Sequence, residues 1–121
     1  MTCRQKCNRY GGGVALFASD IYEYVMVNSL SYLDLSIECV SANVLITNMN
    51  IVIICIYRPR SGNINNYKLT KLLSLASNTN HQGIHIIGDI NLDLLKHASK
   101  THVYEFINIM YYLSMSPLIN Y

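Results

Sequence analysis

Three polar side chains that could do chemistry follow an apolar run in the last third of the chain. Asp89, Asn91 and Asp93 alternate with apolar residues directly after "IHIIG". Carboxylates and amides at this spacing can ligate a divalent cation, orient a water molecule, or only turn the chain where a strand ends. An EF-hand calcium loop begins with the same spacing, but it needs glycine and a carboxylate where this chain has Leu94 and Lys100. A calcium loop is therefore excluded, and a turn at a strand end stays open as the alternative to a catalytic site.

A second polar group follows the other strongly apolar run, "IVIICIY", which ends at Tyr57 and continues into Arg58 and Arg60. In a layered α/β sheet, polar groups at neighbouring strand ends converge on one crevice. A carboxylate, an amide, a phenol and guanidinium groups together suit a phosphate ester. We expect Asp89 to orient or deprotonate a water molecule. Asn91 and Tyr57 would donate hydrogen bonds to phosphoryl oxygens, and Arg58 would hold a phosphate bidentately.

The composition favours one domain with a buried sheet. The chain has 121 residues, of which 51% are apolar and 13% charged, and its formal net charge is +2. The apolar content excludes a disordered chain, and the small net charge is weak support for any partner. The longest apolar run, residues 51–57, is far shorter than the roughly 20 residues of a membrane helix, and no apolar segment of a secretory signal follows the basic N-terminal residues. We therefore expect an intracellular protein, nuclear or cytoplasmic, without a membrane partner.

The four cysteines do not form the pattern of a zinc site. Cys3 and Cys7 make one loosely spaced pair, whereas Cys39 and Cys55 lie separately inside apolar segments. A structural zinc site would need a second pair at similar spacing. We expect ordinary buried or free thiols, and no disulfide-linked partner.

The order of apolar runs and turn residues predicts a layered α/β fold with its sheet buried under helices. The predicted elements are a strand in 14–19, an irregular stretch over 20–35, a hairpin of strands 40–46 and 51–57 with its turn in "TNMN", a helix in 65–77, a loop over 80–83, a buried strand over 84–88 and a helix from a Thr101 N-cap to Pro117. The run 51–57 is apolar without alternation, so it is predicted to be a central strand.

Each predicted helix has an apolar face. The residues near helical spacing in the first helix are Tyr67, Leu69, Leu72, Leu73 and Leu75. Those in the second are Phe106, Ile109, Met110 and Leu113. We expect both faces to pack on the sheet.

Three segments in this order, "GGGVALFAS", "IYRPRSGN" and "IIGDINLDLL", resemble the endonuclease/exonuclease/phosphatase domain of non-LTR retrotransposons of the LINE and jockey type. That domain is similar to apurinic endonucleases and deoxyribonuclease I, and it precedes a reverse transcriptase. The match runs from about residue 9, so residues 1–8 are expected to be an N-terminal tail and residues 9–121 a partial domain. The fold that this resemblance implies is a partial four-layer α/β sandwich.

The resemblance also implies site residues. Asp89 and Asn91 match the G-D-x-N motif of the family, and Tyr57 matches its Y-x-P motif, so these three would surround the scissile phosphate as catalytic residues. Apart from these family positions, Arg58 and Arg60 are expected from their chemistry to bind phosphate or nucleic acid. The implied activity is nicking of target DNA with Mg²⁺, for which Asp89 is a possible ligand.

Other residues depart from the family pattern. The glutamate of its Q-E motif and the histidine of its S-D-H motif have no counterpart in these 121 residues. None of Glu23, Glu38 and Glu105 lies in a Q-E context, and Asn43 stands where many relatives carry a strand glutamate. We therefore expect a fragment, truncated at both ends and inactive as given. A noncatalytic α/β binding or structural module, or a phosphatase or phosphodiesterase of the same superfamily, are the alternatives.

Overall fold

The apolar runs form strands and helices in the computed structural model, which describes residues 2–5, 13–33, 37–59, 66–96 and 98–118. The strands are β1 (Thr2–Gln5), β2 (Val14–Phe17), β3 (Glu23–Met26), β4 (Tyr32–Leu33), β5 (Glu38–Ile46), β6 (Met49–Tyr57) and β7 (Gly83–Asp89). The helices are α1 (Asn66–Ser77) and α2 (Thr101–Tyr112), with 3-10 turns η1 (Asn28–Leu30) and η2 (Leu94–Lys96). The fold is therefore mixed α/β.

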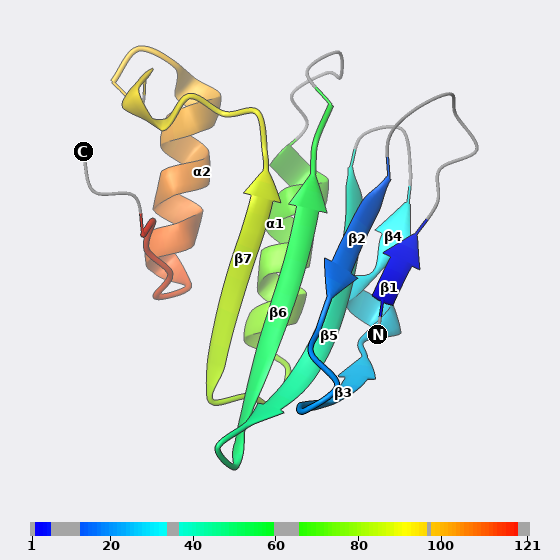
Figure 1. The fold of residues 1–121 in the computed structure, drawn as a ribbon. Coiled ribbons are helices and arrows are strands. Elements are labelled where there is room, and N and C mark those ends of the chain that lie inside the picture. Colours follow the sequence, from blue (N-terminus) through cyan, green and yellow to red (C-terminus); the bar gives the residue numbers. More distant parts are fainter. Residues whose placement is uncertain (1, 6–12, 34–36, 60–65, 97, 119–121) are drawn as a thin grey trace.

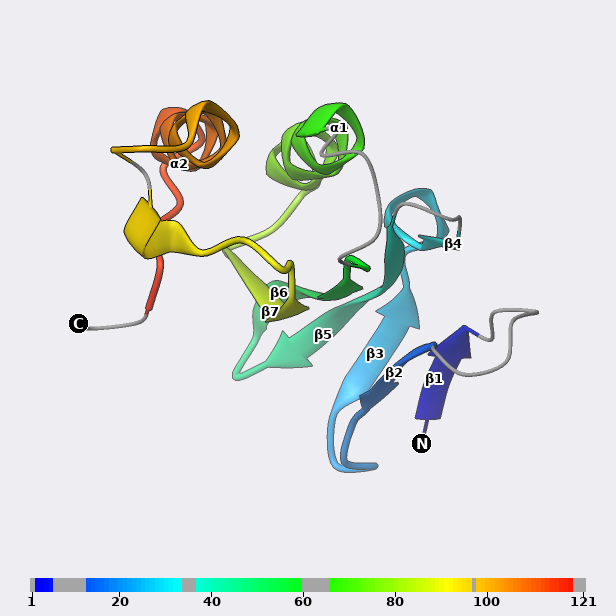
Figure 2. The same ribbon diagram turned by 90° about the horizontal axis from the view of Figure 1, so that it is seen from above.

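The main sheet has the order β3-β5-β6-β7, and β4 pairs with β5 beside β3. Its β6 and β7 are parallel, as a crossover through α1 requires, whereas the other pairs are antiparallel. Both helices lie on one face of this sheet, and the two-stranded ribbon β1-β2 lies on the other (Figures 1 and 2). A layered arrangement of helices and sheet is therefore confirmed.

The hairpin of β5 and β6 turns through two residues, Thr47 and Asn48. Both have positive φ, 47° and 65°, as the type I′ turns that best match the strand twist require. The predicted hairpin is thus confirmed, and Asn50 belongs to β6, where it pairs with Leu45. Because β6 lies between β5 and β7, the predicted central strand is confirmed as well.

Thr47 is the strained member of this turn, because a β-branched side chain fits the left-handed region poorly. We expect Thr47→Asn to stabilise the protein by about 0.5 to 1 kcal/mol, since asparagine tolerates this φ. Thr47→Val keeps the β-branch and is the matched control, so it should bring no gain. The urea midpoints of the three proteins check this, and an equal gain in both variants would contradict it.

One apolar core joins α1 to the sheet. The stripe Leu69, Leu72, Leu73 and Ala76 is buried against β6 residues Val52, Ile54 and Ile56. This stripe has the spacing of one helix face, but Leu75 is 39% exposed. The prediction that Leu75 faces the sheet is therefore wrong, and Tyr67 has its side chain outside the described part.

The stretch predicted to be irregular, 20–35, holds β3, η1 and β4 in its described residues. In β3, Glu23 and Val25 are exposed while Tyr24 and Met26 pack beside Val40 on the face opposite the helices. This alternation is typical of a half-buried strand. The strand β3 is also held by its antiparallel pairing with β5. At the other end, residues 1–8, expected to be a tail, contain β1, which pairs with β2.

The strand β7 is less buried than predicted. Ile84 and Ile86 pack against the core below the helices, whereas Ile87 points to the other face and is 48% exposed. Within the described residues β7 pairs only with β6, so it is an edge strand. The prediction of a buried strand therefore holds for Ile84 and Ile86 and is wrong for Ile87.

The second helix is displaced from its predicted ends. Its cap position is Lys100, which makes no side-chain capping bond, and Thr101 is already helical. The helix ends at Tyr112, and Ser114 with a φ of 58° follows, so Pro117 does not stop it. The predicted apolar face is confirmed, since Phe106 is buried and the other three residues pack against the core: Ile109, Met110 and Leu113.

Candidate functional site

Three polar residues form one row across neighbouring strands at one end of the sheet. Glu38 of β5 pairs with Tyr57 of β6, and Tyr57 pairs with Asp89 of β7. Paired residues of adjacent strands point to the same face, with strands about 4.8 Å apart. Because Ile56 and Cys39 belong to the core under the helices, the row faces the opposite side. The predicted convergence of the two strand ends is thus observed for Tyr57 and Asp89.

Glu38 is the residue that the sequence interpretation missed. Its side chain is only 2% exposed, and its Oε2 atom has no hydrogen-bond partner among the described residues. A buried polar atom without a partner is costly, and such atoms in proteins are explained by a bound water molecule, an ion, local strain or a catalytic role. The sequence feature that could have located Glu38 is the hairpin. A two-residue turn at Thr47 and Asn48 fixes the register of β5 and β6 and places Glu38 opposite Tyr57.

Asn43, which was expected at the place of the family's strand glutamate, lies away from this row. It pairs with Val52, a residue of the core under the helices, and therefore points to the helical face. Glu38 and not Asn43 is the β5 residue next to Tyr57.

Asp89 and Asn91 form a tight turn at the end of β7. Asp89 Oδ1 accepts a hydrogen bond of 2.9 Å from the backbone N–H of Asn91, and Asn91 has a φ of 49°. Both features suit these residue types, because Asp accepts such local bonds and Asn tolerates the left-handed region. The turn role that the sequence left open is thus present, and it leaves Asp89 exposed at the end of the row.

Arg58 directs its guanidinium group at this turn. Its Nε donates to the Ile90 carbonyl at 2.7 Å, and its Nη2 donates to the Asn91 carbonyl at 3.2 Å. Partial burial lowers the pKa of Arg58 through loss of solvation, and arginine nevertheless stays charged at neutral pH. The expected bidentate hold on a phosphate would have to use its other N–H groups. Arg60 lies outside the described residues.

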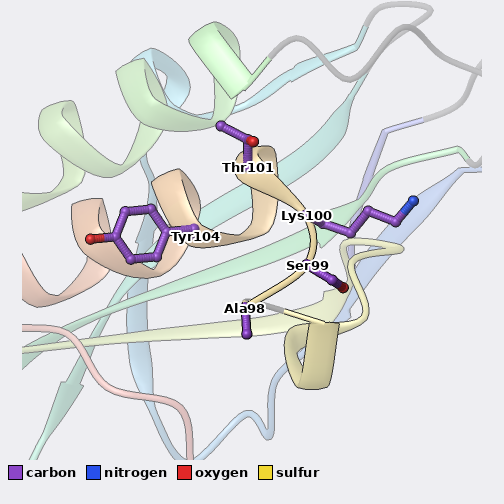
Figure 3. A pocket seen from close by; sticks show the side chains of 5 residues that line it. All are labelled: Ala98, Ser99, Lys100, Thr101 and Tyr104. Atoms are coloured by element: carbon purple, nitrogen blue, oxygen red, sulfur yellow. The ribbon is translucent and has the colours of Figure 1, made fainter.

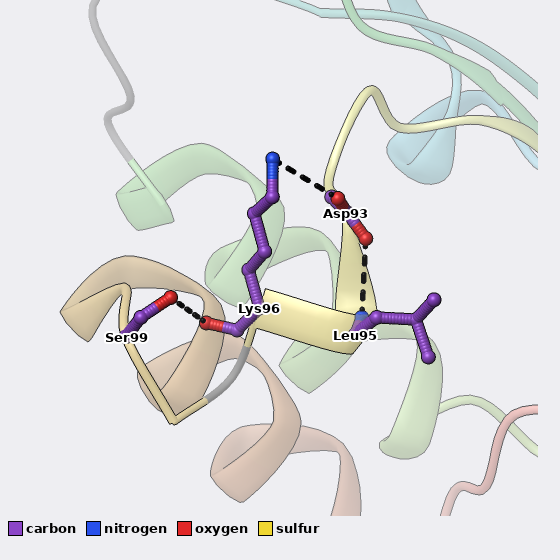
Figure 4. A network of polar contacts seen from close by, with 4 residues as sticks. All are labelled: Asp93, Leu95, Lys96 and Ser99. Carbon is purple, nitrogen blue, oxygen red and sulfur yellow. Dashed lines mark hydrogen bonds and ion pairs between the residues drawn. The ribbon is translucent and has the colours of Figure 1, made fainter.

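Asp93, the third member of the acidic triplet, has a local structural role (Figure 4). Its Oδ1 accepts a hydrogen bond of 3.2 Å from the Leu95 N–H, and its Oδ2 lies 3.3 Å from Lys96 Nζ. Ser99 donates to the Lys96 carbonyl and closes the same turn. The ion pair is exposed, so it contributes little to stability, and Asp93 serves mainly to start η2.

A pocket lies elsewhere, at the start of α2 (Figure 3). Its volume is about 490 Å³, and Ala98, Ser99, Lys100, Thr101 and Tyr104 line it. None of these residues belongs to the row of Glu38, Tyr57 and Asp89. The pocket and the row are therefore separate places.

The described thiols show no sign of reactivity. Cys39 and Cys55 form no disulfide among the described residues, and Cys39 donates to the Leu30 carbonyl at 3.1 Å. Burial raises the pKa of the Cys55 thiol, so near neutral pH it stays protonated and is a poor nucleophile. The side chains of Cys3 and Cys7 lie outside the described part.

Two further findings concern metal ligands and membrane-spanning helices. Within the described ranges, no group of three or more His, Cys, Asp and Glu side chains is placed to hold a metal ion. Of the helices that the structure describes, none has the length and apolarity needed to cross a membrane.

No family model, curated protein or solved structure matches this chain. The resemblance to retroelement endonucleases therefore rests on the sequence motifs alone.

Proposed function

We propose that the chain is part of a metal-dependent DNA endonuclease of the endonuclease/exonuclease/phosphatase type from a non-LTR retroelement. The observation that carries this proposal is the row of Glu38, Tyr57 and Asp89, in which Tyr57 and Asp89, two of the residues that match the family motifs, are neighbours and a buried carboxylate oxygen of Glu38 without a described partner lies on the other side of Tyr57. The helical layer and the two-stranded ribbon on the opposite face of the sheet are compatible with part of a four-layer sandwich of the DNase I type.

The row offers the groups that a phosphodiester needs. Tyr57 is 36% exposed, so its hydroxyl can donate a hydrogen bond to a phosphoryl oxygen. Asp89 engages Oδ1 in the turn, and its exposed carboxylate can orient a water molecule for attack at phosphorus. Glu38 would offer its buried oxygen to a cation.

Magnesium, which the family resemblance implies, commonly uses one or two protein carboxylates and takes its other ligands from water and phosphate oxygens. Glu38 and Asp89 are donors of the right type, at opposite ends of the row. The remaining ligands would come from water, phosphate or residues outside the described part. When bound, the ion would polarise the phosphoryl group.

A noncatalytic α/β module is the second candidate, because the same residues have backbone roles. Asn91 occupies a left-handed position, and Asp89 accepts its N–H. These roles explain the residue types without any reaction.

Plasmid nicking tests the proposal. The 121 residues contain neither a Q-E nor an S-D-H motif, so the test pairs this chain with a longer version that continues into the flanking reading frame. We expect the longer chain to nick supercoiled DNA with Mg²⁺ and to stop on chelation, and this chain to be at least about 100-fold slower, the range of one lost general acid or base. Flanking sequence without these motifs, or a longer chain that does not nick, would overturn the proposal.

Glu38→Gln in the longer chain tests whether Glu38 belongs to the site. The amide keeps the shape of the side chain but cannot carry its charge, so nicking should fall at least about ten-fold while thermal stability stays equal or rises. Glu23→Gln, at an exposed position of β3, is the matched control and should change neither. Unchanged nicking by Glu38→Gln would remove Glu38 from the site.

A further inference from the structure

Residue 58 is hydrogen-bonded to every residue of the 89–91 turn. Its backbone N–H donates to the Asp89 carbonyl at 2.9 Å. Its side chain donates to the carbonyls of Ile90 and Asn91 at 2.7 and 3.2 Å. In return, Asn91 Nδ2 donates to the Arg58 carbonyl at 2.5 Å. These four hydrogen bonds, which we call the clasp, join the ends of β6 and β7.

The shape of the guanidinium group matters in this clasp. Two N–H groups of one planar fork reach two successive carbonyls, Ile90 and Asn91. Lysine carries the same charge on a single ammonium group, and it cannot reproduce a planar pair of donors in fixed geometry. The clasp therefore depends on arginine itself and not on positive charge alone.

The clasp controls where the Asp89 carboxylate lies. Asp89 is held through its carbonyl by the Arg58 N–H and through Oδ1 by the Asn91 N–H. Asn91 is in turn held by Arg58 through both its backbone and its side chain. Without the guanidinium, the turn would lose two of the bonds that fix its direction relative to Tyr57.

We infer that Arg58 is a positioning residue, which fixes the 89–91 turn so that Asp89 stays beside Tyr57 in the row, and that Asn91 is the other half of the same clasp. This inference rests on the proposed function for its effect on catalysis, whereas the clasp itself does not. It differs from a phosphate contact, in which the charge of residue 58 would attract DNA.

Arg58→Lys and Arg58→Gln separate the two roles. In the longer chain we expect both variants to lower the nicking rate at saturating DNA at least about ten-fold, because a displaced carboxylate loses its orientation. The dissociation constant for DNA should change less than two-fold, and its salt dependence should not change. If Arg58 instead contacted a phosphate, Arg58→Lys would nick and bind DNA nearly as wild type does. Arg58→Gln would then reduce the slope of log binding constant against log salt concentration by about one. Lys71→Gln, which removes an exposed charge from α1, is the matched control.

Hydrogen exchange gives a readout that needs no activity. The backbone N–H of residue 58 reports the order of the turn, because its acceptor is the Asp89 carbonyl. We expect its exchange in the 121-residue chain to be about ten-fold faster in both variants, the equivalent of one or two lost hydrogen bonds, and unchanged in Lys71→Gln. Unchanged exchange in Arg58→Lys would overturn the inference, as would wild-type nicking by that variant. If exchange is faster in both variants but the longer wild-type chain does not nick DNA, the clasp is upheld and the proposed function is overturned.

Discussion

Asp89→Asn is expected to abolish phosphodiester hydrolysis and leave the fold intact. Asparagine still offers an oxygen to the Asn91 N–H, which Asp89 Oδ1 now accepts at 2.9 Å, so the turn survives. It removes only the charge that orients water or a cation. We expect nicking by the longer chain to fall about 10³-fold, while the unfolding free energy of the 121-residue chain changes by less than about 0.5 kcal/mol.

Asp89→Ala is the matched comparison, because it removes both the charge and the acceptor. Nicking should fall as far as in Asp89→Asn, but the unfolding free energy should now drop by about 1 kcal/mol through the lost turn bond. Urea denaturation and plasmid nicking measure the two effects. If Asp89→Asn nicks like wild type, the carboxylate is not catalytic, and the turn alone explains this residue.

The fold was predicted correctly where the apolar pattern of a segment and the turn residues beside it indicate the same structure. The unbroken apolar run of β6 and the asparagine-containing turn before it specified a hairpin with a central strand. Leu75 and Ile87 were misplaced because the choice of buried face depends on packing partners distant in sequence. The four-residue strand β3 was missed because much of its stability comes from pairing with β5.

The candidate site was predictable in part for the same reason. Tyr57 and Asp89 could be placed together, because the carboxyl ends of parallel strands meet at one edge. Glu38 could not be placed without the hairpin register, since a shift of one residue moves every side chain to the other face. The partners of Arg58 are carbonyls more than 30 residues away in the chain, and no local pattern encodes them.

Gly88→Ala is expected to cause the largest loss of stability. Gly88 has a φ of 130°, and an added Cβ would lie 1.9 Å from the Ile56 carbonyl oxygen. The obstacle is backbone of the paired strand β6, which cannot move aside like a side chain. Strain at such a φ costs about 1 to 3 kcal/mol, and relief of the clash adds to it, so we expect a loss of about 4 kcal/mol. That is a large share of the roughly 5 to 15 kcal/mol of a typical domain.

Gly83→Ala, at the other end of the same strand, is the matched control for this prediction. Its added Cβ would meet the tip of the Ile51 side chain at 3.1 Å, and a side-chain tip can yield, so the loss should stay below about 1 kcal/mol. Thermal and urea unfolding of both variants measure the difference, and similar losses would contradict the close approach of β6 and β7. Because Ile56 and Gly88 directly precede Tyr57 and Asp89, this approach also sets the distance between the two site residues. Any Gly88→Ala protein that remains folded should therefore show a displaced Asp89 and a loss of nicking beyond its loss of stability.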